Sequence, residues 1–258
     1  MPMCLLQGDE LPPVLEYRRN GRSPFMIAVD HAGNRVPRRL RSLGLTSAQL
    51  AGHIAWDIGA LEVAREMSKI LDAPLVAQNY SRLVIDCNRR FEDPTSIPVF
   101  SASVQIPGNV ALTKEEIEAR QQEIFQRYHD HLDHLLEERH KRRQRTILVI
   151  QHSMTDVFNG VRRRMHAAVL YNRDDDFARL VLDLLRQQPN LIVGENEPYS
   201  ARETAGYTLP HHGERRGIPH VEIEIRQDLI GTDAGQKEWG GRLAGILLEA
   251  ERRYPNTA

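Results

Sequence analysis

The sequence predicts an α/β fold in which a largely parallel β-sheet is covered by helices. Short apolar runs alternate along the chain with longer amphipathic segments, an order that is typical of parallel sheets. Most of these apolar runs are continuous, as expected of strands that are buried on both faces. The 258 residues contain no internal repeat and no low-complexity linker, so we expect a single domain over residues 1–258.

Each element is expected where one of these patterns occurs. The predicted strands are residues 25–29, 75–78, 83–86, 146–150, 167–171, 191–193 and 221–225. The predicted helices are residues 47–53, 58–71, 114–143, 175–188 and 236–253. The longest helix follows a capping box that joins Thr113 to Glu116. Residues 91–112 contain three prolines and are expected to form a long irregular loop, a feature that often serves as a lid or binding loop.

The composition argues against several classes of protein. The 34 Lys and Arg residues nearly balance the 35 Asp and Glu residues, which disfavours a nucleic-acid partner. No apolar run approaches the roughly 18 residues of a membrane-spanning helix, and the N-terminus does not resemble a signal peptide. Only two cysteines are present, which favours a reducing compartment. We therefore expect a soluble, cytoplasmic protein, and the oligomeric state stays open.

Polar side chains follow several of the predicted strands. His31 comes directly after the first strand and His152 after the fourth. Ligands of such sheets gather at the carboxyl ends of the strands. Either histidine alone is more often a hydrogen-bonded loop residue, but two at separate strand ends suggest a Zn²⁺ site with a carboxylate as third ligand. Asp57 is the best candidate, with Asp30 and Asp86 as competitors, although Asp57 could instead cap the following helix.

Two further groups are suited to substrate chemistry. Arg89, after Asn88, can bind a carboxylate through two hydrogen bonds, and Arg82 lies nearby. The alternative is an ordinary solvated arginine. Glu222 and Glu224 share one face of the last strand, where one of them could act as general base or acid beside a metal. The alternative is an edge strand with a polar face.

Six short segments together resemble the N-formylglutamate amidohydrolase family, which is related in fold to zinc carboxypeptidases and aspartoacylases. They are "HAGNRVP", "WDIGALEVAREM", "YSRLVIDCNR", "RYHDHL", "VIQHSM" and "AGYTLPHHG" with "VEIEIRQDL", in the family's order over positions 25–230. The resemblance implies a three-layer α/β/α fold with a mixed, mostly parallel sheet. It also implies a zinc hydrolase that converts a small N-acyl amino acid, with N-formylglutamate as one candidate, to the amino acid and a carboxylic acid.

When the family's functional residues are matched to this sequence position by position, the resemblance implies a complete active site. Its metal ligands are His31, Asp57 and His152, and its catalytic residue is Glu224. Its substrate-binding residues are Arg82, Asn88, Arg89, His129 and His211.

Two positions depart from the related patterns. Asn34 stands where carboxypeptidase relatives carry a ligand glutamate, so the carboxylate must come from elsewhere, which favours Asp57. Pro210 stands where an arginine is expected in formylglutamate enzymes, which would leave one substrate carboxylate without its partner. Two alternatives therefore stay open, a non-catalytic ligand-binding protein of the same fold and a zinc peptidase of the carboxypeptidase type.

Overall fold

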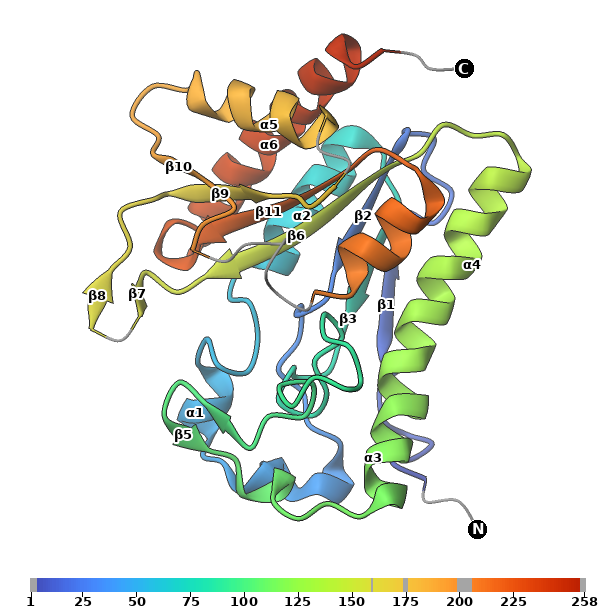
Figure 1. The fold of residues 1–258 in the computed structure, drawn as a ribbon, viewed down its shortest axis with the longest axis vertical. Helices are drawn as coiled ribbons and strands as arrows, with labels where there is room; N and C mark the ends of the chain where they lie inside the picture. Colours follow the sequence, from blue (N-terminus) through green and yellow to red (C-terminus); the bar gives the residue numbers. More distant parts are fainter. Residues whose placement is uncertain (1–3, 159, 174–175, 199–205, 256–258) are drawn as a thin grey trace.

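A seven-stranded sheet lies at the centre of the computed structural model, which describes residues 4–158, 160–173, 176–198 and 206–255 (Figure 1). Its strand order is β1-β3-β2-β6-β11-β9-β10. The strands are β1 (Val14–Tyr17), β2 (Phe25–Val29), β3 (Leu75–Gln78), β6 (Ile147–Met154), β9 (Ala167–Leu170), β10 (Val193–Glu195) and β11 (His220–Arg226). Strands β3, β2, β6 and β11 are parallel neighbours, and β10 runs parallel to β9. Strands β1 and β9 pair antiparallel with β3 and β11, so the sheet is mixed and mostly parallel, as predicted.

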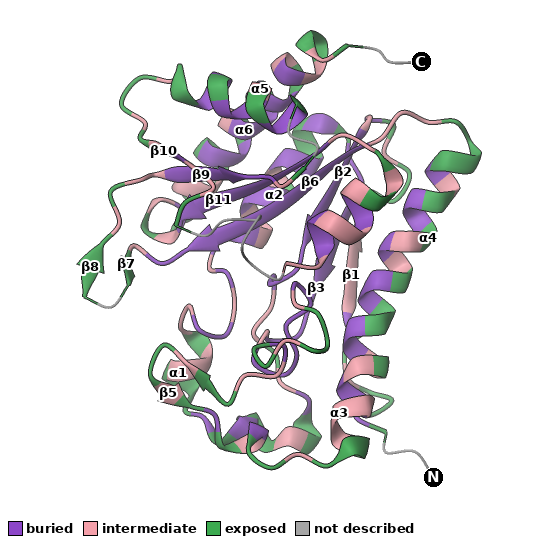
Figure 2. Cartoon of the chain, viewed as in Figure 1, coloured by how far each residue is buried: buried purple, intermediate pink, exposed green. Residues whose placement is uncertain are grey.

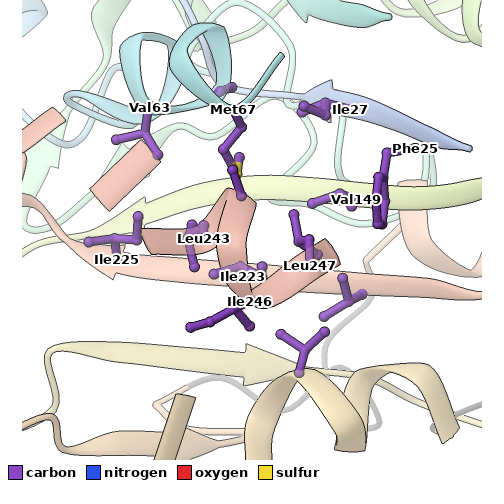
Figure 3. Packing of buried hydrophobic residues seen from close by; sticks show 14 of the residues in the cluster. Phe25, Ile27, Val63, Met67, Val149, Ile223, Ile225, Leu243, Ile246 and Leu247 are labelled. Carbon is purple, nitrogen blue, oxygen red and sulfur yellow. The ribbon is translucent and has the colours of Figure 1, made fainter. Parts of the chain in front are cut away.

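One face of the sheet packs against three helices, α2 (Ala60–Leu71), α5 (Asp176–Arg186) and α6 (Asp233–Arg253). Figure 3 shows Val149 and Ile223 from neighbouring strands beside Met67 of α2 and Leu247 of α6. These side chains are fully buried. Because each removes a large apolar surface from water, each stabilises the fold by about 1.5–3 kcal/mol.

The opposite face is covered by one long helix. It consists of α3 (Lys114–Arg120), a π-helical turn η3 (Gln121–Gln126) and α4 (Arg127–Lys141). Thr113 and Glu116 form the predicted capping box at its start. Its buried stripe, which includes Tyr128 and Leu132, packs against this face of the sheet, while its outer side is exposed (Figure 2). Helices therefore cover both faces, which confirms the three-layer architecture.

The predicted strand at residues 83–86 is wrong, because this segment is a turn and an extended stretch outside the sheet. Its apolar residues Leu83, Val84 and Ile85 are nevertheless buried. They pack in the core between the sheet and the long helix. The carbonyl group of Val84 accepts a hydrogen bond from Arg120 at 3.1 Å, so this backbone is satisfied by a side chain rather than by a neighbouring strand.

Several boundaries also differ from prediction. Strand β6 continues to Met154, so His152 lies inside the strand rather than after it. Strand β10 begins at Val193, where the predicted strand ends, and β1 was not predicted. Helix α5 is described from Asp176, and the predicted start at residue 175 lies outside the described residues. No helix in the described part of the chain is long and apolar enough to cross a membrane.

The remaining elements are short. The predicted loop 91–112 contains a hairpin of β4 (Phe100–Ser101) and β5 (Val104–Gln105), and a second hairpin joins β7 (Val157–Phe158) to β8 (Val161–Arg162). Both hairpins lie on the same side of the molecule, at the left of Figure 1. The short helices are α1 (Ser47–Ala51), η1 (Arg38–Gly44), η2 (Pro107–Asn109), η4 (Leu209–Gly213), η5 (Glu214–Arg216) and η6 (Gln227–Leu229).

Candidate active site

Three adjacent parallel strands, β2, β6 and β11, place His31, His152 and Glu224 near their carboxyl ends, and Asp57, Arg82, Asn88 and Arg89 come from loops. The register places His152 opposite Glu224 in neighbouring strands. Odd-numbered residues of β11, such as Ile223, face α2 and α6. Because side chains alternate along a strand, Glu222 and Glu224 face the other side. Strand β11 is an inner strand and both glutamates are buried, so the edge-strand interpretation is wrong.

A cavity of about 420 Å³ opens at these strand ends. Its wall includes seven of the residues that the sequence singled out: His31, Asp57, Arg82, Asn88, Arg89, His152 and Glu224. Thr95, Pro98 and Phe100 from the predicted loop also line it, which fits the expectation of a binding loop. The volume lies in the range of small-molecule sites.

The three predicted metal ligands form a compact, buried group. The Oδ2 atom of Asp57 lies 3.3 Å from Nδ1 of His31 and 2.7 Å from Nδ1 of His152. Ligands held about 2 Å from a tetrahedral zinc ion lie roughly 3.3 Å apart, so the contact between His31 and Asp57 matches this spacing and that between His152 and Asp57 is shorter. The alternative in which Asp57 caps a helix is wrong, because α2 begins at Ala60 with Gly59 as its N-cap and the Asp57 carboxylate faces the histidines.

The two competing carboxylates lie behind the histidine rings. The Nε2 atom of His31 lies 2.7 Å from Oδ1 of Asp86, and Nε2 of His152 lies 3.4 Å from Oδ2 of Asp30. When a carboxylate accepts a hydrogen bond from the N–H of one ring nitrogen of a histidine, the other ring nitrogen is free to bind a metal. Asp86 is therefore placed to orient His31, whereas the 3.4 Å contact with Asp30 leaves Nε2 of His152 without a hydrogen-bond partner among the described residues. Asn34 donates to the carbonyl of Leu50 at 2.9 Å and takes no part in the group.

Charges around the site shift several pKa values. Burial alone raises the pKa of Asp57, but His31 and His152 outweigh it and hold that pKa below its usual value. Burial also raises the pKa of Glu224, to about 7, and the nearby His152 offsets only part of this rise. The Oε2 atom of Glu224 has no hydrogen-bond partner among the described residues. Glu224 is thus a buried carboxyl group that can gain or lose a proton near neutral pH.

Two arginines of the cavity wall differ in how fully they are paired. Arg82 donates to Oδ2 of Asp86 at 3.0 and 2.6 Å, and its Nη1 atom lies 3.5 Å from Oδ1 of Asp57. Within the described chain, the guanidinium group of Arg89 donates only to the carbonyl of Asn88, at 3.0 Å. Arg89 is therefore the arginine with donors to spare for a bound anion.

Asn88 connects this segment to the start of η4. Its Oδ1 atom accepts hydrogen bonds from the backbone amides of Tyr207 and Thr208, at 2.8 and 3.0 Å. The two contacts use the acceptor of the side chain and leave its amide group, which lies at the cavity wall, as a donor.

The described cavity wall does not include His129 or His211. The Nε2 atom of His129 lies 2.8 Å from the carbonyl oxygen of Cys87, and its Nδ1 atom lies 2.8 Å from Nε2 of His212. Burial, together with His212, lowers the pKa of His129 to about 3, so this ring is neutral. The ring of His211 stacks on Tyr207 at 4.5 Å. Both histidines support the segments behind the site, and their contact with substrate stays a prediction.

Sequence reasoning missed the aromatic part of the wall. Phe100 and Phe158 come from the two hairpins, and both line the cavity while remaining 63% and 41% exposed. A sequence signal for this contact was lacking, since it depends on two hairpins that are distant along the chain. His53 also lines the cavity and was not singled out.

Comparison with known proteins places this geometry in context. The sequence profile of the N-formylglutamate amidohydrolase family matches residues 23–231. The crystal structure of the gene product Atu2144 from Agrobacterium tumefaciens is similar, with a TM-score of 0.93, 33% identity and coverage of 96% of this chain and 98% of that one. That of N-formylglutamate amidohydrolase from Ralstonia eutropha JMP134 has a TM-score of 0.64, 21% identity and coverage of 94% and 98%. No curated protein sequence matches.

Proposed function

The chain belongs to the N-formylglutamate amidohydrolase family and is a hydrolase of amide bonds, and from this premise we propose that it is a zinc-dependent hydrolase of small N-acyl amino acids. The observation that carries the proposal is one cavity that joins three groups. They are the buried cluster of His31, Asp57 and His152, the unpartnered Glu224, and the incompletely paired Arg89. Metal binding, proton transfer and carboxylate recognition are the functions that such a hydrolysis needs.

His31, Asp57 and His152 would hold the zinc ion. Two imidazoles and one carboxylate form a ligand set that catalytic zinc sites use. Zinc held there would supply Lewis-acid chemistry, which lowers the pKa of a bound water molecule to about 7 and polarises a carbonyl group. Asp86 would keep the ring of His31 in the required orientation from behind, and the carboxylate of Asp30 lies 3.4 Å from Nε2 of His152.

Glu224 would move the proton. It takes a proton from the attacking water at its unpartnered Oε2 atom and delivers it to the nitrogen of the leaving amine. A carboxyl group with a pKa of about 7 suits both steps, because it exchanges its proton readily near neutral pH. The bond between the acyl carbon and the nitrogen breaks, and one water is consumed for each amine and carboxylic acid released.

Arg89 and Asn88 would bind the substrate's carboxylate. The guanidinium group of Arg89 has donors left over, and the neighbouring Asn88 has a side-chain amide group whose N–H donors remain available. Anchoring the carboxylate fixes the scissile amide relative to Glu224 and the metal ligands, which lowers the entropic part of the barrier. Arg82 is already paired with Asp86, so we assign it mainly to orienting that carboxylate.

The test is a hydrolysis assay on zinc-loaded protein with N-formyl and N-acetyl amino acids, including N-formylglutamate. We expect the free amino acid and formate or acetate to appear in equal amounts. A chelator should stop the reaction, and added zinc should restore it. Tight binding of these compounds by zinc-loaded wild type without any turnover would contradict the proposal and favour the non-catalytic alternative.

A further inference from the structure

The cavity wall combines a charged cluster at the carboxyl ends of the strands with apolar side chains from the surrounding segments. The metal-ligand cluster, Glu222 and Glu224 occupy the carboxyl ends of the strands. The rest of the wall is mixed. Its apolar side chains include Ile54, Leu83, Pro98, Phe100, Phe158 and Leu209, and its polar ones include Thr95, Ser101 and Thr155. Phe100 and Phe158 are both exposed large hydrophobic side chains. Exposed aromatic rings at the wall of a binding cavity offer apolar surface that a ligand can cover.

The charges of the same wall limit how many carboxylates a ligand can place there. Arg82 and Arg89 are the arginines among the described wall residues, which include no lysine. Arg82 is already shared between Asp86 and Asp57, which leaves Arg89 for one substrate carboxylate. Among the described wall residues, a second carboxylate would find neutral donors such as Thr95, Ser101 and Thr155 but no further arginine or lysine, and burying a charge without a cationic partner is costly.

The position of Pro210 agrees with a wall that binds only one substrate carboxylate. Pro210 lines the cavity in the first turn of η4, next to Leu209. Its ring adds apolar surface and offers no hydrogen-bond donor from its side chain or backbone nitrogen. This part of the wall therefore favours an apolar group over an anionic one.

We propose that the preferred substrate carries one carboxylate and one bulky apolar group, in place of the two carboxylates of N-formylglutamate. The inference rests on the proposed function and narrows its substrate class. The apolar group can belong to the amino-acid side chain or to the acyl group, since either can extend from the scissile amide to the hairpins that carry Phe100 and Phe158.

A panel of four compounds tests this inference on zinc-loaded protein. They are N-acetylphenylalanine, N-phenylacetylglycine, N-acetylglutamate and N-acetylglycine. We expect kcat/KM for one or both aromatic compounds to exceed that for N-acetylglutamate by about tenfold or more. The first two compounds show whether the side chain or the acyl group supplies the apolar part. Equal or faster hydrolysis of N-acetylglutamate would overturn the inference while leaving the proposed hydrolase function intact.

Dissociation constants for the same compounds, measured by calorimetry, decide the inference independently of turnover. If none is hydrolysed, the proposed function fails, but tighter binding of an aromatic compound than of N-acetylglutamate still supports the substrate class. The reverse order of affinity overturns it.

A matched pair of hairpin variants locates the apolar subsite. Phe158→Ser removes a ring that lines the cavity, whereas Val161→Ser alters the partner strand β8 at a residue outside the described cavity wall. We expect Phe158→Ser to lower the preference for the aromatic compound over N-acetylglycine about tenfold, and Val161→Ser to leave this preference unchanged. Equal preferences in both variants and the wild type would overturn the assignment of Phe158.

Discussion

The Nε2 atom of His31 lies 2.7 Å from Oδ1 of Asp86, and the Nδ1 atom of the same ring faces Asp57 at 3.3 Å. This relationship suits Asp86 to orient His31, the first of the proposed metal ligands. We predict that Asp86→Ala weakens zinc affinity by about 10–100-fold, because such supporting carboxylates tune metal binding to this extent. A competition titration against a chelator measures the change, with the exposed Glu92→Ala as control. Unchanged affinity in Asp86→Ala would show that the contact does not support a metal ligand.

Replacing Glu224, the proposed proton carrier, distinguishes an effect on the chemical step from an effect on substrate binding. We predict that Glu224→Gln lowers kcat by about 10²–10⁴-fold, because a positioned acid–base group contributes a factor of this size. The amide has nearly the same shape as the carboxyl group, so the zinc content of the protein and its KM should change little. Steady-state kinetics and metal analysis on one preparation provide both values. Turnover close to that of wild type would remove Glu224 from the mechanism.

Arg89 should act mainly on substrate binding. A hydrogen bond to a charged group contributes about 1.5–3 kcal/mol, so Arg89→Ala should raise KM by roughly 10–100-fold. The neighbouring Arg90 is exposed and is not among the described wall residues, which makes Arg90→Ala a matched control. If both variants raise KM equally, the substrate is attracted by general positive charge rather than bound by Arg89.

His129 should make the stability of the fold depend on pH. Burial, with His212 nearby, lowers its pKa from 6.5 in the unfolded chain to about 3 in the fold. Below about pH 6.5 the unfolded chain therefore takes up a proton that the folded protein excludes, and stability falls as pH falls. The loss attributable to His129 is about 2 kcal/mol between pH 6.5 and pH 5.

The variant His129→Gln removes this titration and keeps a polar side chain. Urea unfolding at the two pH values should show a smaller pH-dependent loss in His129→Gln than in wild type. The exposed His140→Gln should behave as wild type. An identical pH dependence in His129→Gln would mean that other groups cause the loss.

Much of the sheet and its inner site could be predicted from local sequence pattern. Strands β2 and β3 were predicted with their observed bounds, because continuous apolar runs between turns have few other stable arrangements in an α/β fold. His31, Asp57 and His152 converge because they follow or lie near the carboxyl ends of the central parallel strands.

The features that were not predicted correctly from the sequence also have physical causes. The apolar run at residues 83–86 is as buried as a strand. One of its carbonyl groups accepts a hydrogen bond from the buried Arg120 instead of from a neighbouring β-strand. The roles of Asp30 and Asp86 behind the histidines depend on three-dimensional direction, which spacing along the chain does not contain. The aromatic wall depends on two-residue strands, which are too short to show a periodic pattern.

Metal content tests the central claim most directly. Purified wild type, His31→Ala and the exposed-site control His140→Ala should be loaded with zinc, dialysed, and analysed for metal by mass spectrometry and for amide hydrolysis. The account predicts one zinc per chain and full activity in wild type and His140→Ala, with loss of both zinc and activity in His31→Ala. Active wild-type protein without zinc, or His31→Ala that retains full activity, would contradict it.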